Sequence, residues 1–213
     1  MLVYLHGFAS GPGSTKAQFF RAALAEHGVA LEIPDLAPDF THQTITGMLR
    51  IVDALLDRAP AVLLGSSLGG YLAALTAARR PDRVPALVLF APAFGFAQRW
   101  PGRIGADAFA RWRATGTMPV WHYGRETYLP LAIDLLDDAA RWPAEPDPTC
   151  PALVFAGRRD DTVPLADVER FVRRRPDARE LVLLDAGHEL TDVLEPMWAA
   201  ARAFLGRLAA LPD

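Results

Sequence analysis

Apolar runs of four to seven residues alternate with longer amphipathic stretches along most of the chain. Runs of this length that are rich in Val, Leu and Ala predict strands, and stretches with helical periodicity predict the helices between them. The predicted strands are Leu2–Leu5, Val29–Ile33, Ala61–Leu64, Ala86–Phe90, Ala152–Phe155 and Glu180–Leu184. The predicted helices are Thr15–His27, Thr41–Ala59, Leu68–Arg80, Pro164–Arg175 and Thr191–Leu208.

This regular alternation of strand and helix predicts an α/β fold. Strands that are apolar along their whole length are typical of a parallel sheet, because helices cover both of its faces. Short connections and right-handed crossovers then favour an open, doubly wound and mostly parallel sheet of about six strands. A length of 213 residues fits a single domain that spans residues 1–213.

Residues 97–148 interrupt the alternation. About fifty residues between two consecutive strands are far more than a crossover needs. We expect an inserted, mostly helical cap over the carboxyl edge of the sheet, where such folds bind ligands. The aromatic side chains of the segment either line a pocket or pack the insertion onto the core. They include four of the five tryptophans, and they are Trp100, Phe109, Trp112, Trp121, Tyr123, Tyr128 and Trp142.

Composition and charge exclude several classes of protein. The formal net charge of −3 provides no electrostatic basis for binding nucleic acid. Residues 59–78 are uncharged and long enough to span a bilayer, but the cluster Gly65–Gly70 predicts a strand, a turn and a helix instead. The single cysteine, Cys150, cannot form an internal disulfide and is expected to be a buried structural thiol. No secretory signal precedes the first apolar run, so we expect a cytoplasmic protein.

The strongest candidate for chemistry is the segment Gly65-Ser66-Ser67-Leu68-Gly69, which follows a predicted strand and begins a predicted helix. This G-x-S-x-G pattern is typical of a tight turn that exposes a serine nucleophile above the edge of a sheet. Small neighbours are required because the serine adopts a strained backbone conformation. The pattern therefore predicts Ser67 as the nucleophile.

A base and an acid for this serine follow later strands. His188 lies in a loop after the last predicted strand, at the sheet edge where Ser67 is expected. Asp160 and Asp161 follow the preceding strand, and either carboxylate could orient the imidazole of His188. Spacing alone does not choose between the two. The four other histidines are less suited, since they lie at helix ends, in the insertion or in the first loop.

The first predicted strand ends in the segment Leu5-His6-Gly7-Phe8. A glycine at this point lets the backbone turn so that the next N–H group faces the site. The backbone N–H groups of Phe8 and Leu68 are therefore candidates for an oxyanion hole with two donors.

Together these motifs resemble the α/β-hydrolases, in which the chain order is nucleophile, acid and histidine. The segments Tyr4–Phe8, Ser14–Ala17 and Gly65–Tyr71 narrow the resemblance to the small bacterial YqiA-type esterases. In the superfamily the acid lies three residues after a strand-end glycine and three before the valine of a Val-Pro pair. The resemblance therefore implies Asp160 rather than Asp161 as the acid.

The sequence thus predicts a serine hydrolase that cleaves carboxylic esters of small molecules through an acyl-enzyme on Ser67. A thioesterase with the same triad is an alternative, as is a lyase or cofactor-free peroxidase on this fold. A binding scaffold without catalysis is an alternative from another class. No cofactor or metal is expected, since Gly11–Lys16 fits neither a phosphate loop nor a dinucleotide loop. The oligomeric state cannot be predicted.

Overall fold

Six parallel strands form one open sheet in the order β2-β1-β3-β4-β7-β8. The structure, a computed structural model, describes residues 1–210. The strands are β1 (Leu2–Leu5), β2 (Leu31–Glu32), β3 (Val62–Ser66), β4 (Leu87–Phe90), β7 (Ala152–Gly157) and β8 (Arg179–Leu184). The predicted α/β fold with a parallel sheet is therefore confirmed.

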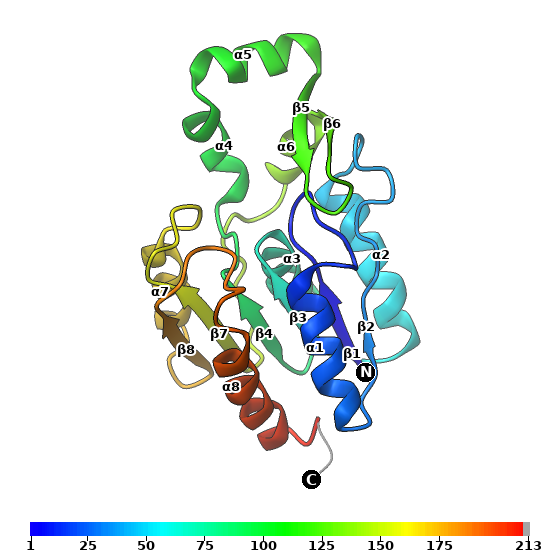
Figure 1. Ribbon diagram of the computed structural model, residues 1–213, viewed down its shortest axis with the longest axis vertical. Coiled ribbons are helices and arrows are strands. Elements are labelled where there is room, and N and C mark those ends of the chain that lie inside the picture. Colours follow the sequence, from blue (N-terminus) through cyan, green and yellow to red (C-terminus); the bar gives the residue numbers. More distant parts are fainter. Residues whose placement is uncertain (211–213) are drawn as a thin grey trace.

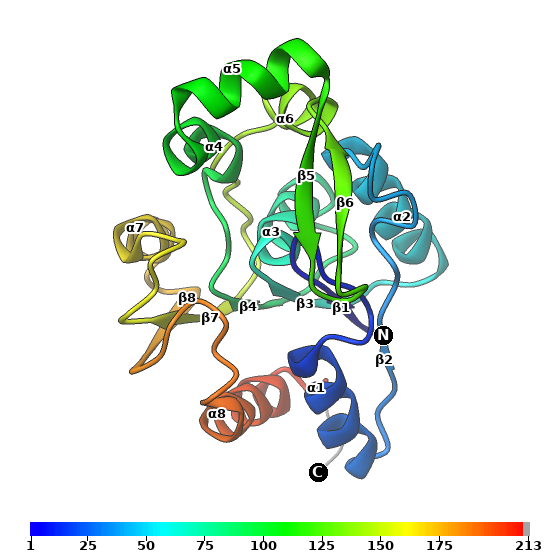
Figure 2. The same cartoon turned by 45° about the horizontal axis from the view of Figure 1, so that its top comes forward.

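Helices cover both faces of this sheet, as Figures 1 and 2 show. On one face lie α1 (Thr15–Glu26) and α8 (Leu194–Arg207), which pack against each other. On the other face lie α2 (Ile45–Arg58), α3 (Leu68–Arg79) and α7 (Leu165–Arg173). The molecule consequently has two hydrophobic clusters that share the sheet between them.

Strand β1 illustrates how one short apolar run supplies both clusters. Successive side chains of a strand point to opposite faces of a sheet. Leu2 and Tyr4 belong to the cluster beneath α1 and α8, whereas Val3 and Leu5 belong to the cluster beneath α2 and α3. All four are 5% exposed or less, which is why the run shows no polar alternation.

Most differences from the predicted elements lie at their ends. The strand expected over Val29–Ile33 is only two residues long, and α2 begins at Ile45 rather than Thr41. The Thr44 side chain accepts a hydrogen bond from the Gly47 N–H and so caps α2. The predicted start at Thr41 was too early, because the residues before the cap continue the pattern of polar and apolar positions of the helix.

The chain between β4 and β7 holds three helices and a hairpin. These elements are α4 (Phe96–Ile104), α5 (Ala106–Thr115), β5 (Thr117–His122), β6 (Thr127–Ala132) and α6 (Asp134–Ala139). Helices α4 and α5 and the hairpin project beyond the carboxyl ends of the sheet strands (Figure 1).

The hairpin was not predicted from the sequence, because each of its strands contains a proline. Pro119 and Pro130 are paired directly opposite each other. Proline removes a ladder hydrogen bond and is tolerated only at the edge of a sheet. A two-stranded ribbon consists of edges alone, so it accommodates both prolines.

The apolar stretch of residues 59–78 forms β3, the following turn and most of α3. Within the part of the chain that the structure describes, no helix is long and apolar enough to cross a membrane.

Candidate active site

Ser67 lies at the sharp turn between β3 and α3. Its backbone has φ 52° and ψ −116°, a strained conformation for a residue with a side chain. Two hydrogen bonds to the neighbouring segment hold it there. The Ser67 N–H donates to Phe90 O at 2.9 Å, and the Ala93 N–H donates to Ser67 O at 3.0 Å. The serine is therefore fixed by backbone contacts with the end of β4.

The two glycines of the motif are required by close approach of the backbone. A Cβ atom on Gly69 would lie 2.0 Å from the carbonyl oxygen of Leu5, in β1. A Cβ atom on Gly65 would lie 2.4 Å from the carbonyl oxygen of Gly69. Any larger residue would push α3 away from β1 and β3, and the turn that holds Ser67 would open.

The structure brings the side chains of Ser67, His188 and Asp160 together in one hydrogen-bonded chain. His188 Nε2 lies 2.9 Å from Ser67 Oγ, and His188 Nδ1 lies 2.9 Å from Asp160 Oδ2. The His188 side chain is 14% exposed and that of Asp160 is 4% exposed. These three residues come from the loops after β3, β7 and β8, at the carboxyl edge of the sheet.

The carboxylate of Asp160 is held in its charged form. Burial would raise the pKa of Asp160, but hydrogen bonds from His188 and from the backbone of Val163 and Thr162 lower it below its ordinary value. Oδ1 accepts both backbone bonds, each at 2.8 Å, which leaves Oδ2 for the imidazole. An ionised Asp160 can only accept, so Nδ1 of His188 carries the proton and Nε2 is free to accept one.

Asp161, the alternative acid, is directed elsewhere. Its side chain accepts a hydrogen bond from the hydroxyl of Thr162 at 3.2 Å in an exposed position. The geometry therefore separates two neighbouring carboxylates that sequence spacing could not.

Two backbone N–H groups of residues that line the cavity with Ser67 are without an acceptor among the described residues. They are the N–H groups of Phe8 and Leu68. Leu68 is the first residue of α3, so its N–H belongs to the free amino end of a helix. The two groups stay the candidate donors for the oxyanion hole expected from the sequence.

His6 organises the loop that carries Phe8. Its Nδ1 donates to Gly7 O at 3.0 Å, and its Nε2 accepts from the Leu36 N–H at 3.0 Å. The residue is 3% exposed, and burial lowers the pKa of its imidazole. His6 is therefore neutral in the folded protein and serves as a connector between two loops.

A cavity of about 910 Å³ opens above these groups. Loop residues after β1 form one wall, while α4 and the β5–β6 hairpin form others. Its lining is mixed: aromatic rings stand beside charged groups on the same surface. The charged residues of the lining are Lys16, Asp35, Arg99, Arg103, Arg125 and Glu189.

The aromatic residues of the insertion divide between lining and packing. Trp100, Trp121 and Tyr123 line the cavity. Trp112 is 1% exposed and donates its indole N–H to Leu131 O at 2.9 Å, so it packs the insertion internally. Tyr128 is 67% exposed and lies edge-on against Trp121, with 5.2 Å between the ring centroids. Both of the expected roles occur, and sequence alone could not assign them ring by ring.

The other candidate groups lie apart from the triad. His42 pairs with Asp39 at the surface, and His27 lies against Trp198. His122 lines the cavity but is buried against Phe40, and burial lowers the pKa of its imidazole. Residues 1–210 contain no group of three or more His, Cys, Asp or Glu side chains arranged to hold a metal ion.

Cys150 is a free thiol in the segment that leads into β7. Burial raises its pKa to about 11, so the thiol stays protonated at neutral pH. It was expected to be buried and is partly buried, packed against the larger hydrophobic cluster.

One residue of the site was missed in the sequence. Lys16 lies in a stretch that was rejected as a phosphate loop, and it was given no role. In the structure it lines the cavity and is only 7% exposed. The signal that could have found it is that Lys16 is the only lysine of the chain.

A parallel sheet with its site at the strand ends and a serine on a strained turn define a protein of the α/β-hydrolase superfamily. A putative hydrolase from Agrobacterium vitis S4 has the same fold, with a TM-score of 0.83, 25% identity, and coverage of 95% of this chain and 86% of that one. Mouse alpha/beta hydrolase domain-containing protein 10 is similar with a TM-score of 0.81 and 20% identity, and the match covers 97% of this chain and 90% of that one.

Est1E from Butyrivibrio proteoclasticus, in a structure with bound ferulic acid, is similar with a TM-score of 0.81 and 21% identity. The match covers 98% of this chain and 89% of Est1E. The chain belongs to the Uncharacterised protein family (UPF0227), whose model matches residues 1–205. The superfamily predicted from the motifs is thus confirmed.

Proposed function

We propose that this protein is a serine hydrolase that cleaves carboxylic esters through an acyl-enzyme on Ser67. The observation that carries the proposal is the continuous hydrogen-bonded chain from Ser67 Oγ through His188 to Asp160, with 2.9 Å at each link. A serine hydroxyl is a weak nucleophile unless an adjacent base accepts its proton. His188 is that base, and its hydrogen bond to Asp160 favours the tautomer that can accept the proton of Ser67.

The first half of the reaction follows from this geometry. His188 Nε2 takes the proton of Ser67 as Oγ attacks the acyl carbonyl carbon, and Asp160 stabilises the resulting imidazolium. The carbonyl oxygen becomes an oxyanion, which the N–H groups of Phe8 and Leu68 stabilise. When the tetrahedral intermediate collapses, His188 gives the proton to the departing alcohol.

The second half repeats these steps with water. His188 takes a proton from a water molecule that attacks the acyl carbon, and the proton passes to Ser67 Oγ when the acid leaves. The same proton relay serves both halves, so no step needs a redox partner.

The cavity supports small-molecule esters as the substrates. Rings of Phe8, Phe96 and Trp100 lie within 6.5 Å of one another on the wall above Ser67, measured between centroids. An apolar wall of this kind favours short-to-medium acyl chains or aromatic groups. We therefore expect the rate on p-nitrophenyl esters to pass through a maximum as the acyl chain grows.

The test is a panel of p-nitrophenyl esters and matched thioesters on the wild type and on Ser67→Ala. We expect ester turnover by the wild type and a loss on the order of 10⁶-fold in kcat for the variant. A fluorophosphonate should label the wild type once per chain and leave Ser67→Ala unlabelled.

Other outcomes select the alternatives. Faster turnover of the thioesters would make the protein a thioesterase with the same triad. Absence of both turnover and labelling would refute the serine mechanism and leave a binding scaffold. A flat profile across acyl chain lengths would contradict the inferred apolar pocket.

A further inference from the structure

Lys16 is an exception among the basic residues of this protein, since all the others are arginine. It is the second residue of α1, directly after the loop that carries Phe8. Its side chain is buried, at 7% exposure of the residue, and it reaches the wall of the cavity. Burying an ammonium group is unfavourable unless it has partners, so the position calls for an explanation.

The partner of the ammonium group lies in the loop of the catalytic histidine. Lys16 Nζ donates a hydrogen bond to the backbone carbonyl of Glu189, the residue that follows His188. Burial lowers the pKa of Lys16, while the nearby carboxylates of Glu189 and Asp160 favour its charged form. The bond links α1 to the loop between β8 and α8 across 173 residues of sequence.

That loop has little else to hold its backbone. The loop forms turns at residues 188–189 and 191–192, but within residues 1–210 the backbone groups of residues 187–192 make no hydrogen bond of ordinary geometry with other backbone groups. Leu190 has φ 53°, a conformation that a residue with a side chain adopts only when its surroundings impose it. The Leu190 side chain is 1% exposed, so packing secures one end of the loop. The bond from Lys16 holds the preceding residue, Glu189, which is next to His188.

We propose that Lys16 is a positioning residue for catalysis, whose hydrogen bond to the Glu189 carbonyl holds the His188 imidazole between Ser67 and Asp160. This role rests on the proposed function. A displacement of about 1 Å in a reacting group can cost on the order of 10²-fold in rate. A loop held by few backbone bonds needs such an anchor, because the imidazole must hold its place through two proton transfers.

The chemistry of the bond suits a lysine. An ammonium group is a compact charge that one carbonyl can meet end on, whereas a guanidinium is a wide planar fork. The single backbone carbonyl of Glu189 is an acceptor of this kind.

The first test compares Lys16→Met with Gln18→Met. Methionine has nearly the length of lysine but cannot donate. Gln18 is a matched control on the same helix, since its Nε2 donates to Pro12 O at 2.6 Å and does not touch the His188 loop. We expect Lys16→Met to lower kcat about 10- to 100-fold with KM within about twofold. Gln18→Met should retain the wild-type kcat, and unfolding midpoints of both variants check that they are folded.

The second test restores the missing group. Lys16→Ala leaves a space beside the cavity that propylammonium matches, since it contains the atoms that the substitution removes. Added propylammonium should raise kcat of Lys16→Ala, while tetramethylammonium, which carries the charge but cannot donate a hydrogen bond, should not. Unchanged kcat in Lys16→Met, or equal losses in Lys16→Met and Gln18→Met, would overturn the role of Lys16 and leave the esterase proposal intact.

A spectroscopic measurement separates this inference from the proposed function. We expect the proton between His188 Nδ1 and Asp160 to give a far-downfield proton resonance, whose observation needs no substrate. We expect it to broaden or disappear in Lys16→Met and to persist in Gln18→Met. A resonance that persists in both variants would contradict the anchoring. A wild-type protein that shows the resonance but neither cleaves esters nor reacts with fluorophosphonate would refute the proposed function and, with it, a catalytic role for Lys16.

Discussion

Neighbouring residues with the same side chain have different surroundings at several points of this structure. Asp160 accepts three hydrogen bonds in a buried position, whereas the next residue, Asp161, is exposed and accepts one from Thr162. Their sequence neighbourhood is the same, so spacing alone proposed both, and the choice of Asp160 came from the resemblance to the α/β-hydrolases. The difference arises from the turn after β7, which directs one carboxylate inward and the other outward.

The pair provides a prediction with an internal control. Asp160→Asn should lower kcat on the order of 10⁴-fold, because an amide in contact with Nδ1 favours the tautomer whose Nε2 cannot accept a proton. Asp161→Asn should leave kcat unchanged. Steady-state rates on a p-nitrophenyl ester measure both effects. A larger loss of kcat in Asp161→Asn than in Asp160→Asn would show that Asp160 is not the acid.

His6 makes stability depend on pH. Burial holds the pKa of this imidazole below its ordinary value of 6.5, so the folded protein disfavours the proton. Below that pH the unfolded chain takes up a proton that the folded protein does not, and the free energy of unfolding therefore decreases as pH falls. The loss continues until the pH reaches the lowered pKa in the folded state.

The measurement is the free energy of unfolding at pH 8 and pH 5. We expect His6→Gln, whose side-chain carbonyl can still accept from Leu36 N–H, to lose less stability over this range than the wild type. His42→Gln is the control, because the His42 side chain is 67% exposed. Equal slopes in the wild type and His6→Gln would contradict the prediction.

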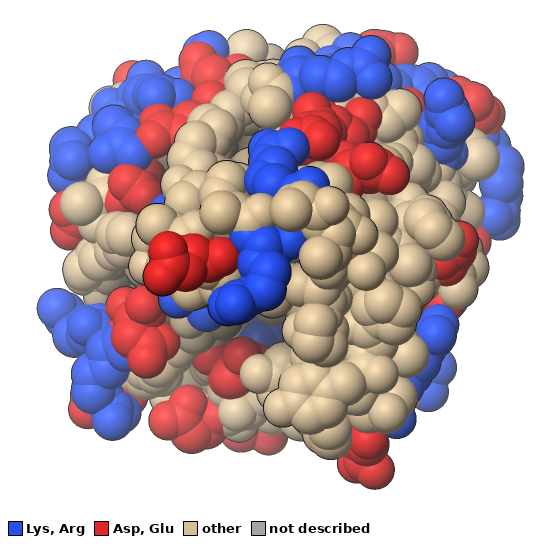
Figure 3. All heavy atoms as spheres, turned by 90° about the horizontal axis from the view of Figure 1, so that it is seen from above, with Lys and Arg blue, Asp and Glu red and all other residues tan. Residues whose placement is uncertain are grey.

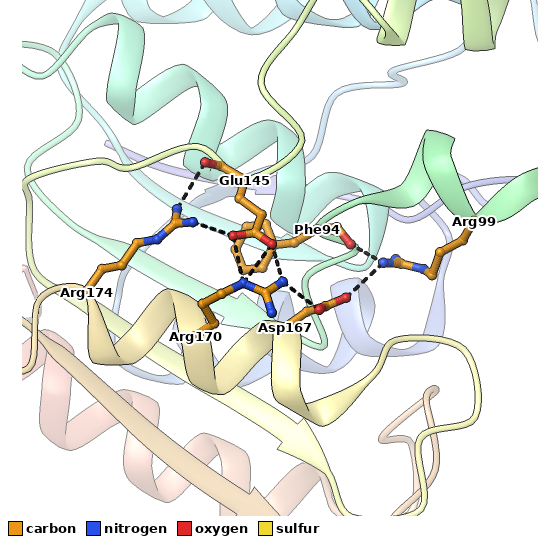
Figure 4. Close-up of polar contacts among 6 residues, drawn as sticks. All are labelled: Phe94, Arg99, Glu145, Asp167, Arg170 and Arg174. Carbon is orange, nitrogen blue, oxygen red and sulfur yellow. Dashed lines mark hydrogen bonds and ion pairs between the residues drawn. The ribbon is translucent and has the colours of Figure 1, made fainter.

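At the scale of helices and strands, polar contacts connect the insertion to the core. Figure 4 shows one such chain, in which Arg99 of α4 contacts Asp167 of α7 and Asp167 contacts Arg170. Arg170 and Arg174 both bind the carboxylate of Glu145. The chain therefore ties α4, α7 and the segment before β7 to one another.

A second connection joins α6 to the first turn of α2. Asp138 Oδ2 accepts from the Thr46 N–H at 2.6 Å, and Asp138 Oδ1 accepts from the Thr46 hydroxyl at 2.7 Å. A carboxylate is favourable at the amino end of a helix because free N–H groups and the helix dipole meet it there. Asp138 is 9% exposed, so water does not replace these bonds.

We expect Asp138→Ala to lower the free energy of unfolding by about 2 kcal/mol, because it leaves the partly buried Thr46 N–H group without a partner. Asp137→Ala is the matched control. Its carboxylate pairs with Arg113 at the surface, where an ion pair contributes about 0–1 kcal/mol. Denaturant unfolding of the two variants tests the difference, and equal losses would show that the contact to α2 is not stabilising.

Most of the strands and helices of the sheet could be predicted from the sequence. The strands are buried on both faces and their runs are apolar, which is why they were found together with their parallel arrangement. The contacts of Asp138 and Lys16 could not be predicted, since each joins segments far apart in the chain and leaves no local periodic signal. The hairpin was not predicted for a different reason: prolines are unusual in strands, and each of its strands contains one.

In the whole molecule, two hydrophobic clusters share one sheet, and the insertion packs onto the larger of them. On the face seen from above, acidic and basic side chains lie side by side (Figure 3). Ion pairs between exposed groups each contribute little, so apolar contact determines whether the insertion and the sheet unfold together. Trp100, Phe96 and Trp142 provide such contact with the larger cluster.

The tryptophans provide a test of this unity. Trp198 lies against Phe20 on α1, and the four others lie between β4 and β7. In a Trp198→Phe variant, fluorescence therefore reports on the insertion alone, while far-UV circular dichroism reports on the whole chain. We expect the two denaturant midpoints to coincide, as in a single cooperative unit. A fluorescence midpoint at a lower denaturant concentration than the circular dichroism midpoint would show that the insertion is a separate folding unit.

The short strand β2 has a consequence for the behaviour of the protein at high concentration. Exposed edge strands present unpaired backbone groups that can template pairing with another molecule. With only Leu31 and Glu32 in β2, that border of the sheet offers too little backbone for a second chain to join. The opposite border, β8, is six residues long. Any edge-to-edge aggregation through this sheet would consequently begin at β8, where Glu180 is the exposed charged residue that opposes it.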